Sequence, residues 1–400
     1  MMNRFMNQVM RVGLAGLVIC LSIYLSIYLS MQNASAETTG VSTSAQSPPD
    51  LVWHGFISQG FIKTGTNNYL SNSQEGSFDF TEVGLNVTKS LSDNIDIGAQ
   101  LFSRKFGPNE NFNVKFDWFY ANYQHSNWLK IKAGRIKIPF GLYNEMSDID
   151  SARVPILLPQ SVYPSQSRNF LLAQNGAQVY GFIDLGKGGS LDYHLYAGSI
   201  NIDLPPVTST AMIITQIDVP HILGGRLLWE TPLEGFKTAF TLQNLDLDIN
   251  LTQLGTPVKA DLPVVQTVFS AEYTLRRLLL ASEYQRQYVE ITSTPATFNS
   301  RTNGEQYYVL ANYQLTDAFA PGIYYSVSTP DVGNMVGRER HQNDFAFYCR
   351  YDFNPNWLIK LEGHLMDGTA SLKTELNDNA PLSSLHENWQ VVMLKTTAFF

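Results

Sequence analysis

Apolar and polar residues alternate with a period of two along most of the chain from Leu51 onward. In residues 95–101 the odd positions are isoleucine, alanine and leucine, whereas the even positions are aspartate, glycine and glutamine. The same alternation recurs in residues 191–197, 307–315 and 357–365. Because successive side chains of a strand point to opposite faces, each run predicts a strand with one apolar and one polar face. About sixteen such runs follow one another between turn residues.

The connections between these runs alternate between short and long. Short ones fall at residues 92–94, 126–127 and 354–356, and long ones at residues 139–174 and 250–262. Short turns and long loops in alternation are typical of a membrane barrel, whereas a soluble β-sandwich or propeller gives no reason for this order. The sequence therefore predicts an all-β, transmembrane antiparallel β-barrel of about 16 strands. A lysine or arginine facing lipid at the midplane costs about 2–4 kcal/mol, which explains why charged residues occupy only alternate positions, on the face away from lipid.

The N-terminal residues have the order of a secretory signal peptide. Arg4 and Arg11 come first, an apolar run over residues 12–31 follows, and Ala34-Ser35-Ala36 provides a small-residue cleavage site. Cleavage is expected after Ala36. Two alternatives stay open, namely an uncleaved anchor helix, since the apolar run is long enough to span a bilayer, and a lipoprotein modified at Cys20.

The chain is thus expected to have three parts. Residues 1–36 are the signal peptide, residues 37–50 form a disordered lead-in rich in serine, threonine and proline, and residues 51–400 form the barrel. An exported barrel belongs in the outer membrane of a Gram-negative bacterium, in contact with outer-membrane lipids and lipopolysaccharide. The C-terminal Phe400 closes an alternating strand, and we expect it to be the sorting signal that the barrel-assembly machinery recognises.

The composition excludes several classes of protein. Removal of residues 1–36 lowers the number of basic residues from 27 to 25, against 35 acidic residues, for a formal charge of −10. This acidic balance, without any basic stripe, argues against nucleic-acid binding. Cys349 is the one cysteine left, so no intrachain disulfide is expected. Because it shares its parity with Phe345 and Phe347, we expect it on the lipid face as a small apolar side chain.

Motifs of catalysis and of metal binding are missing from the sequence. There is no G-x-S-x-G nucleophile elbow and no H-E-x-x-H zinc motif, and the seven histidines are scattered. His194 and His364 have lumen-facing parity but stand alone. Residues 246–250 carry alternating aspartates without the glycine and glutamate of a calcium loop. We therefore expect no enzyme activity, no cofactor and no metal site.

The longest connection, residues 139–174, is expected to set the function. Loops of this length in a compact fold are usually functional, and a barrel of this size encloses an aqueous channel that something must narrow. Pro155, Pro159 and Pro164 stiffen the loop, and the apolar residues 156–158 favour packing against the inner wall. We expect a constriction loop folded into the lumen, with an extracellular cap or a trimer contact as the alternatives.

Basic residues gather on the wall that precedes this loop. Lys130 and Lys132 have lumen-facing parity, and Arg135 and Lys137 fit the lumen only if the register shifts at Gly134, as a β-bulge would allow. Rings of lysine or arginine select for anions in pores. Inward-facing acids such as Glu82 and Glu362 oppose this charge, so anion preference stays open. The candidate pore-lining residues are Arg104, Lys115, Lys130, Lys132, Arg135, Lys137, Arg153 and Arg168.

Two stretches resemble the phosphate-selective porin (porin O and P type) superfamily. Gly134-Arg135-Ile136-Lys137-Ile138-Pro139-Phe140-Gly141-Leu142 looks like the G-R/Q-x-K-x-P-F-G-L segment of that family, and residues 53–60 look like its opening strand. The resemblance implies a sixteen-stranded, trimeric outer-membrane channel with its third extracellular loop folded inside. Arg135 and Lys137 match the motif, whereas the arginine ladder of the phosphate channels is not traceable in this sequence.

These patterns together predict a porin for passive diffusion of small hydrophilic solutes. An anion preference, for phosphate or small carboxylates, is one form of this prediction, and neutral solutes are the other. The alternative is a structural, adhesive or enzymatic outer-membrane barrel without general pore activity.

Overall fold

The computed structural model describes residues 51–107, 110–202, 212–296 and 298–400. The expected signal peptide and lead-in, residues 1–50, lie outside the described residues. Among those described, no helix has the length and apolar character needed to cross a bilayer.

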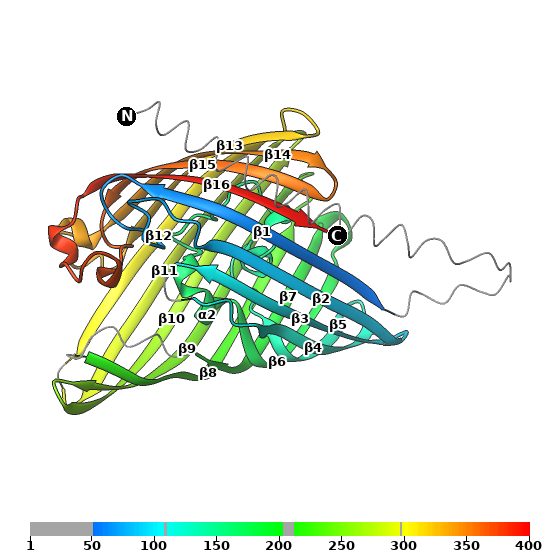
Figure 1. Cartoon of the computed structure of the whole chain (residues 1–400). Coiled ribbons are helices and arrows are strands. Elements are labelled where there is room, and N and C mark those ends of the chain that lie inside the picture. Colours follow the sequence, from blue (N-terminus) through cyan, green and yellow to red (C-terminus); the bar gives the residue numbers. More distant parts are fainter. Residues whose placement is uncertain (1–50, 108–109, 203–211, 297) are drawn as a thin grey trace, which may run out of the picture.

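Sixteen strands form one closed antiparallel sheet, and each strand pairs with its neighbours in sequence (Figure 1). This confirms the predicted barrel. The strands are β1 (Val52–Thr64), β2 (Phe80–Ser92), β3 (Ile95–Phe106), β4 (Lys115–Ser126), β5 (Leu129–Lys137), β6 (Ala173–Asp184), β7 (Ser190–Asn201), β8 (Met212–Glu230), β9 (Phe236–Gln253), β10 (Thr256–Leu275), β11 (Leu278–Thr294), β12 (Ser300–Tyr313), β13 (Phe319–Thr329), β14 (Gln342–Asn354), β15 (Trp357–Gly368) and β16 (Asn388–Phe399).

The barrel closes where the last strand meets the first. Phe56 of β1 lies opposite Phe399 of β16, and the pairing continues without a register shift to Thr64. The backbone N–H of Phe400 donates to the carbonyl of Gly55 over 3.0 Å, and that of Gly55 donates back over 3.1 Å. The C-terminal residue is therefore part of the seam, and no sheet edge is left open there.

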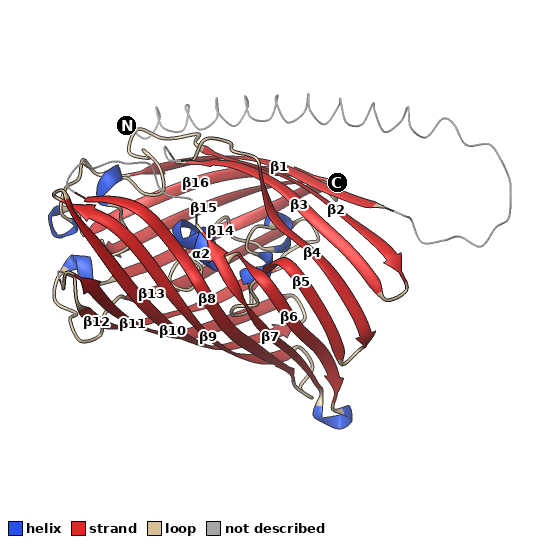
Figure 2. Cartoon of the chain, turned by 90° about the horizontal axis from the view of Figure 1, so that it is seen from below, coloured by secondary structure: helices blue, strands red, loops and turns tan. Residues whose placement is uncertain are grey.

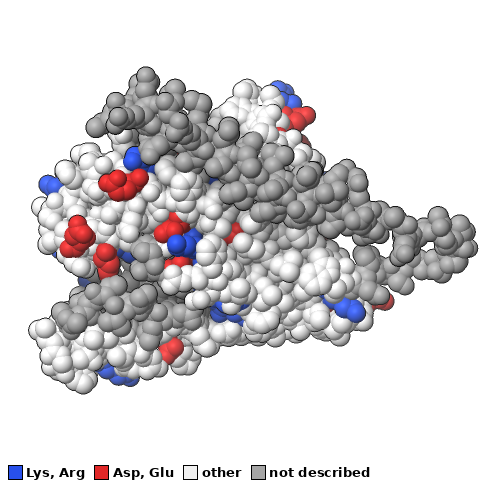
Figure 3. All heavy atoms as spheres, in the orientation of Figure 1, with Lys and Arg blue, Asp and Glu red and all other residues white. Residues whose placement is uncertain are grey.

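The two faces of the strands differ as the alternation predicts. On β15, Leu361 and Leu365 are about half exposed on the outside, whereas Lys360, Glu362 and His364 are buried on the inside. Cys349 lies among outward aromatic side chains, as expected. Charged side chains are sparse on the visible barrel wall in Figure 3. An apolar outer face around a polar interior is the arrangement that a membrane-spanning barrel requires.

One predicted loop is wrong. Residues 250–262 are strand rather than loop, because β9 and β10 pair from Phe236 and Tyr273 up to a tight turn at Leu254 and Gly255. Thr252, Thr256 and Asp261 of this stretch are typical loop residues, but they occupy regular ladder positions in two of the longest strands. A polar composition therefore indicates that a strand extends beyond the apolar zone of the membrane, and does not indicate that the strand ends.

Residues 138–172, which connect β5 to β6, run through the inside of the barrel and are called the lumen segment below. They contain three short 3-10 turns (Asn144–Met146, Asp150–Ala152 and Ser165–Ser167) and the one-turn helix α2 (Arg168–Leu171). Figure 2 shows α2 surrounded by strands. The segment packs its buried residues, including Ile138, Phe140, Leu158 and Tyr163, against the inner faces of β7 to β14.

Candidate functional site

Two of the predicted basic residues line the wall of β5 as their parity requires. Lys132 lies opposite the buried Gln178 of β6, while its neighbours Ile131 and Ala133 face outward. The ammonium of Lys132 lies 4.7 Å from the ring centre of Tyr120 and 5.1 Å from that of Tyr180. Lys130 lies 5.9 Å from the Tyr180 ring. Cation–π contacts of this kind hold both ammonium groups against the wall.

The β-bulge predicted at Gly134 is wrong. The pairing of β5 with β4 and with β6 is regular on both sides of this residue. Gly134 instead adopts a φ of +133°, and a Cβ there would lie 2.4 Å from the carbonyl oxygen of Phe119. The glycine therefore permits close approach of two strands. Next to it, Arg135 is half-buried and donates from Nε to the carbonyl of Asp117 over 2.9 Å.

Lys137 reaches the lumen segment without a bulge, because it is the last residue of β5 and the chain turns inward after it. Its ammonium lies 2.6 Å from the carboxylate of Asp148 and 2.8 Å from the carbonyl of Glu145. Burial raises the pKa of Asp148, whereas the positive charges of Lys137 and Arg168 lower it. The charges have the larger effect, so the pKa lies below its usual range. The first turn of the lumen segment is thus fixed to β5 by a charged pair.

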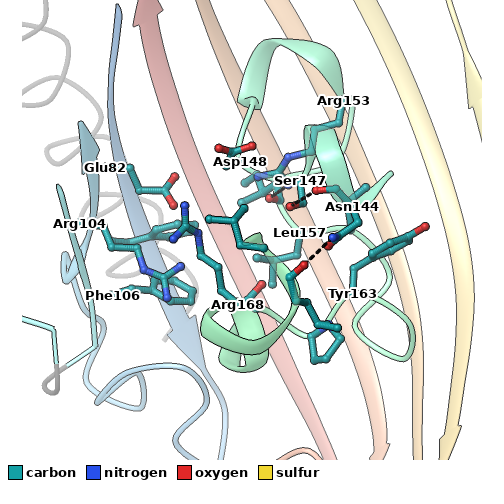
Figure 4. A pocket seen from close by; sticks show the side chains of 17 residues that line it. Glu82, Arg104, Phe106, Asn144, Ser147, Asp148, Arg153, Leu157, Tyr163 and Arg168 are labelled. Atoms are coloured by element: carbon teal, nitrogen blue, oxygen red, sulfur yellow. Dashed lines mark hydrogen bonds between the residues drawn. The ribbon is translucent and has the colours of Figure 1, made fainter. Parts of the chain in front are cut away.

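A cavity of about 60 Å³ lies between the lumen segment and the inner face of β2 and β3. Figure 4 shows Glu82 and Arg104 on the strands, facing Arg168 and Asp148 of the segment across this space. Arg153 also lines the cavity. Three of the eight predicted basic residues, Arg104, Arg153 and Arg168, therefore meet here, together with two carboxylates.

Each of these arginines has an acidic partner. Arg168 lies 2.6 Å from Asp117 of β4, and its guanidinium stacks 4.3 Å above the ring centre of Phe102. Arg104 lies 2.5 Å from Glu110. Arg153 lies 3.5 Å from Asp150. Lys115, the remaining predicted residue, is half-buried at the start of β4 and does not line this cavity.

Sequence reasoning missed the residues that fix the lumen segment to the opposite wall. Asp150 accepts from the ammonium groups of Lys360 on β15 and Lys395 on β16, over 3.0 and 3.3 Å, and from the hydroxyl of Thr397 over 2.6 Å. Burial raises the pKa of Asp150, but the two ammonium groups and Arg153 lower it far more, so this carboxylate stays ionised. The alternation of residues predicts that Lys360 and Lys395 face the lumen, but it does not indicate that they pair with Asp150.

A second contact joins the segment to β10, β11 and β12. The buried carboxylate of Glu283 accepts from the hydroxyls of Tyr163, Tyr308 and Ser270. It also accepts from the backbone N–H of Leu142 over 2.9 Å. Four donors satisfy this buried acid, as such groups require.

A third contact uses Glu362 of β15, which accepts from the backbone N–H groups of Ile156 and Leu157. His364 bridges Glu362 to Asp344, at 2.9 Å from each carboxylate. The apolar residues 156–158 of the segment are therefore held by a carboxylate that takes their backbone donors. Contacts on β9 to β16 and on β4 fix the segment across the whole lumen.

Two larger spaces lie on either side of the lumen segment. One, of about 370 Å³, reaches Pro164 from the end with the long connections, and its lining includes Ser371 and Pro330. The other, of about 260 Å³, reaches Pro155 from the end with the short turns, and its lining includes Arg277. The lumen segment thus lines a space at each mouth of the barrel.

No protein-family model matches the chain, and no curated protein matches it in sequence. Solved structures do match. The barrel is similar to outer-membrane expressed OmpT of Vibrio cholerae, with 9% identity over 89% of this chain and 100% of that one and a TM-score of 0.57. The chain has the fold of an outer-membrane barrel.

Two further matches extend this likeness. The anion-selective porin from Comamonas acidovorans is 11% identical over 88% of this chain and 99% of that one, with a TM-score of 0.54. OmpF of Salmonella typhi, in a complex with daunomycin, is 14% identical over 88% and 97%, with a TM-score of 0.55. At these identities the likeness is one of fold. The resemblance of residues 134–142 to the phosphate-selective porins stays a prediction.

Proposed function

We propose that this protein is an outer-membrane porin that lets small hydrophilic solutes diffuse passively across the membrane. The observation that carries the proposal is the charged cavity between the lumen segment and the inner face of β2 and β3, lined by Arg104, Arg168, Glu82 and Asp148. A closed barrel of sixteen strands is wide enough to enclose an aqueous channel. The lumen segment narrows that channel, and the polar slot beside it is the passage for solutes.

The slot has a weak preference for anions. Arg104, Arg153 and Arg168 line it against Glu82 and Asp148, which leaves one positive charge in excess. Basic side chains that line a pore attract anions and repel cations. Because each arginine is paired with a carboxylate, the preference is modest, and small carboxylates or phosphate pass together with neutral solutes.

The remaining parts of the proposal concern the setting of the channel. A cleaved signal peptide exports the chain, and its last strand with Phe400 is the part that the barrel-assembly machinery recognises. The mature barrel sits among outer-membrane lipids and lipopolysaccharide as a homotrimer. OmpT of Vibrio cholerae, whose fold this chain shares, is known in a trimer form, which supports this assembly.

Solute uptake into vesicles separates a porin from a structural or enzymatic barrel. Vesicles that contain the purified protein are diluted into isotonic solutions of a small sugar, a small carboxylate or a large oligosaccharide, and swelling is followed by light scattering. A porin admits the small solutes and excludes the large one. If vesicles with the folded barrel swell no faster than empty vesicles, the protein has no general pore activity.

A further inference from the structure

Three side chains with metal-binding donors meet at the end of the barrel that carries the long connections. His341 directly precedes β14, Asp367 is close to the end of β15, and Glu387 directly precedes β16. One donor atom of each residue lies within 4.8 Å of the other two. Nε2 of His341 lies 3.6 Å from Oδ2 of Asp367. The sequence predicted no metal site, because three separate strand ends supply these donors and no short motif contains them.

The backbone around these residues is fixed by hydrogen bonds. Gly368 donates from its N–H to the carbonyl of Glu387 over 2.9 Å, and Ala370 donates to the carbonyl of His341 over 3.2 Å. Gly368 has a φ of +100°, and a Cβ there would lie 2.1 Å from the carbonyl oxygen of His341. Only glycine fits this close approach. The three donors are therefore attached to a rigid corner of the wall and not to a free loop.

A neighbouring side chain orients one of the carboxylates. Nδ2 of Asn343 donates to Oδ2 of Asp367 over 2.9 Å. In metal sites, hydrogen bonds of this kind fix the ligand carboxylates and are worth ten- to a hundredfold in affinity. This Oδ2 is the same oxygen that lies 3.6 Å from Nε2 of His341, so Asn343 holds it toward the cluster.

We propose that His341, Asp367 and Glu387 bind a divalent first-row transition metal ion, with Zn²⁺ as the best fit. One imidazole nitrogen and two carboxylate oxygens form a ligand set that Zn²⁺ takes at about 2.0–2.2 Å. Two carboxylates with a neutral imidazole neutralise a dication. The side chains of His341 and Asp367 are 26% and 45% exposed, so the ion enters from solvent and completes its coordination with water.

The ion ties the connection of residues 369–387 to the barrel wall. Glu387 is the last residue of this connection, and the other two ligands belong to β14 and β15. At its middle the connection contacts the β1–β2 loop, since Asn68 donates to the carbonyl of Leu376 over 2.7 Å. Its Ser371 lines the space of about 370 Å³ at this mouth of the barrel. Metal binding therefore stabilises the rim of that mouth.

The test is calorimetric titration of ZnCl₂ into the purified, chelator-treated barrel in detergent. The wild type is expected to show one site per chain. His341→Ala and Glu387→Gln are each expected to weaken binding more than tenfold, and Asn343→Leu ten- to a hundredfold. His386→Ala is the matched control, because this exposed histidine neighbours Glu387 and uses only its backbone in the contact with Asn67. It is expected to bind as the wild type does.

Circular dichroism verifies that each variant is folded. If His341→Ala does not fold, the Glu387→Gln and Asn343→Leu titrations decide, because neither change removes a buried group. Absence of a site in the wild type overturns the proposal. Equal binding by His341→Ala, Glu387→Gln and the wild type overturns it too, because the ion then binds elsewhere.

Discussion

Asp150, on the lumen segment, lies 3.0 Å from the ammonium nitrogen of Lys360 on β15, and both side chains are at most 2% exposed. The same carboxylate meets Lys395 of β16 at 3.3 Å. One carboxylate therefore contacts two buried ammonium groups on adjacent strands, and Lys395 also pairs with Glu82 over 2.7 Å. The position of the lumen segment, and with it the width of the slot, depends on this contact.

Replacement of Asp150 by Asn is expected to destabilise the protein strongly. Removal of one partner from a buried ion pair leaves an uncompensated charge and costs about 3–5 kcal/mol. The measurement is the free energy of unfolding from urea titration in lipid vesicles. Asp317→Asn is the control, because Asp317 pairs with Arg277 at 3.6 Å on an exposed turn, where ion pairs contribute about 0–1 kcal/mol. Equal losses in the two variants would contradict the role given to Asp150.

The contribution of Asp150 to the free energy of unfolding is expected to persist at mildly acidic pH. The pKa of Asp150 is lowered in the folded protein, since Lys360 and Lys395 outweigh the effect of burial. A lowered pKa stabilises the fold fully above the unfolded value of about 3.9 and loses that effect as the pH falls through the folded value. The difference in unfolding free energy between wild type and Asp150→Asn should therefore shrink as the pH falls below about 4. A difference that disappears between pH 7 and pH 5 would argue against this ionised carboxylate.

Replacement of Tyr163 by Phe is expected to loosen the lumen segment from β11. The change removes one of the donors to the buried Glu283, and an unsatisfied buried group costs about 1–3 kcal/mol. Tyr193→Phe is a matched control, because its hydroxyl donates to the carbonyl of Trp128 at an exposed position over 2.6 Å. Urea titration should show the larger loss for Tyr163→Phe, and a greater loss for the control would place the important contact elsewhere.

Replacement of Arg104 and Arg168 by Gln is expected to reduce the anion preference. A unit charge 4 Å from a permeating ion in water contributes about 1 kcal/mol, so each removed charge lowers the anion permeability and raises the cation permeability by up to about fivefold each. Arg301→Gln is the control, because Arg301 pairs with Glu290 at a position that is 70% exposed. A permeability ratio that is the same in the double variant and the control would remove these arginines from the passage.

Replacement of Lys130, Lys132, Arg135 and Lys137 by Gln tests the basic wall of β5 separately. These side chains follow one strand, and two of them stack on tyrosine rings. If the wall attracts anions toward the slot, anion permeability falls in the quadruple variant. Unchanged permeability would leave the selectivity to the three arginines of the slot, Arg104, Arg153 and Arg168.

The strands and their two faces could be predicted from the sequence because lipid and water impose a local rule at every second residue. The end of the β9–β10 hairpin was wrongly predicted as a loop. Outside the apolar zone the alternation of apolar and polar residues is no longer required, and polar residues occupy both faces. A glycine within a strand indicates either a positive φ or a bulge. At Gly134 only the pairing register, which the structure provides, distinguishes the two.

The contacts of the lumen segment could not be predicted at all. Parity indicates that Lys360 and Glu362 face the lumen, but the partner of each depends on how a segment more than two hundred residues earlier folds. The cluster of His341, Asp367 and Glu387 depends in the same way on three strand ends that meet only in the closed barrel.

The zero-current potential of the purified barrel in a planar bilayer, across a tenfold KCl gradient, tests the proposed pore most directly. A conducting channel with a modest anion preference is the predicted result, since the slot beside the lumen segment carries one excess positive charge. A cation preference would contradict the role of the arginines. Absence of any conductance in a folded, inserted barrel would contradict the porin itself.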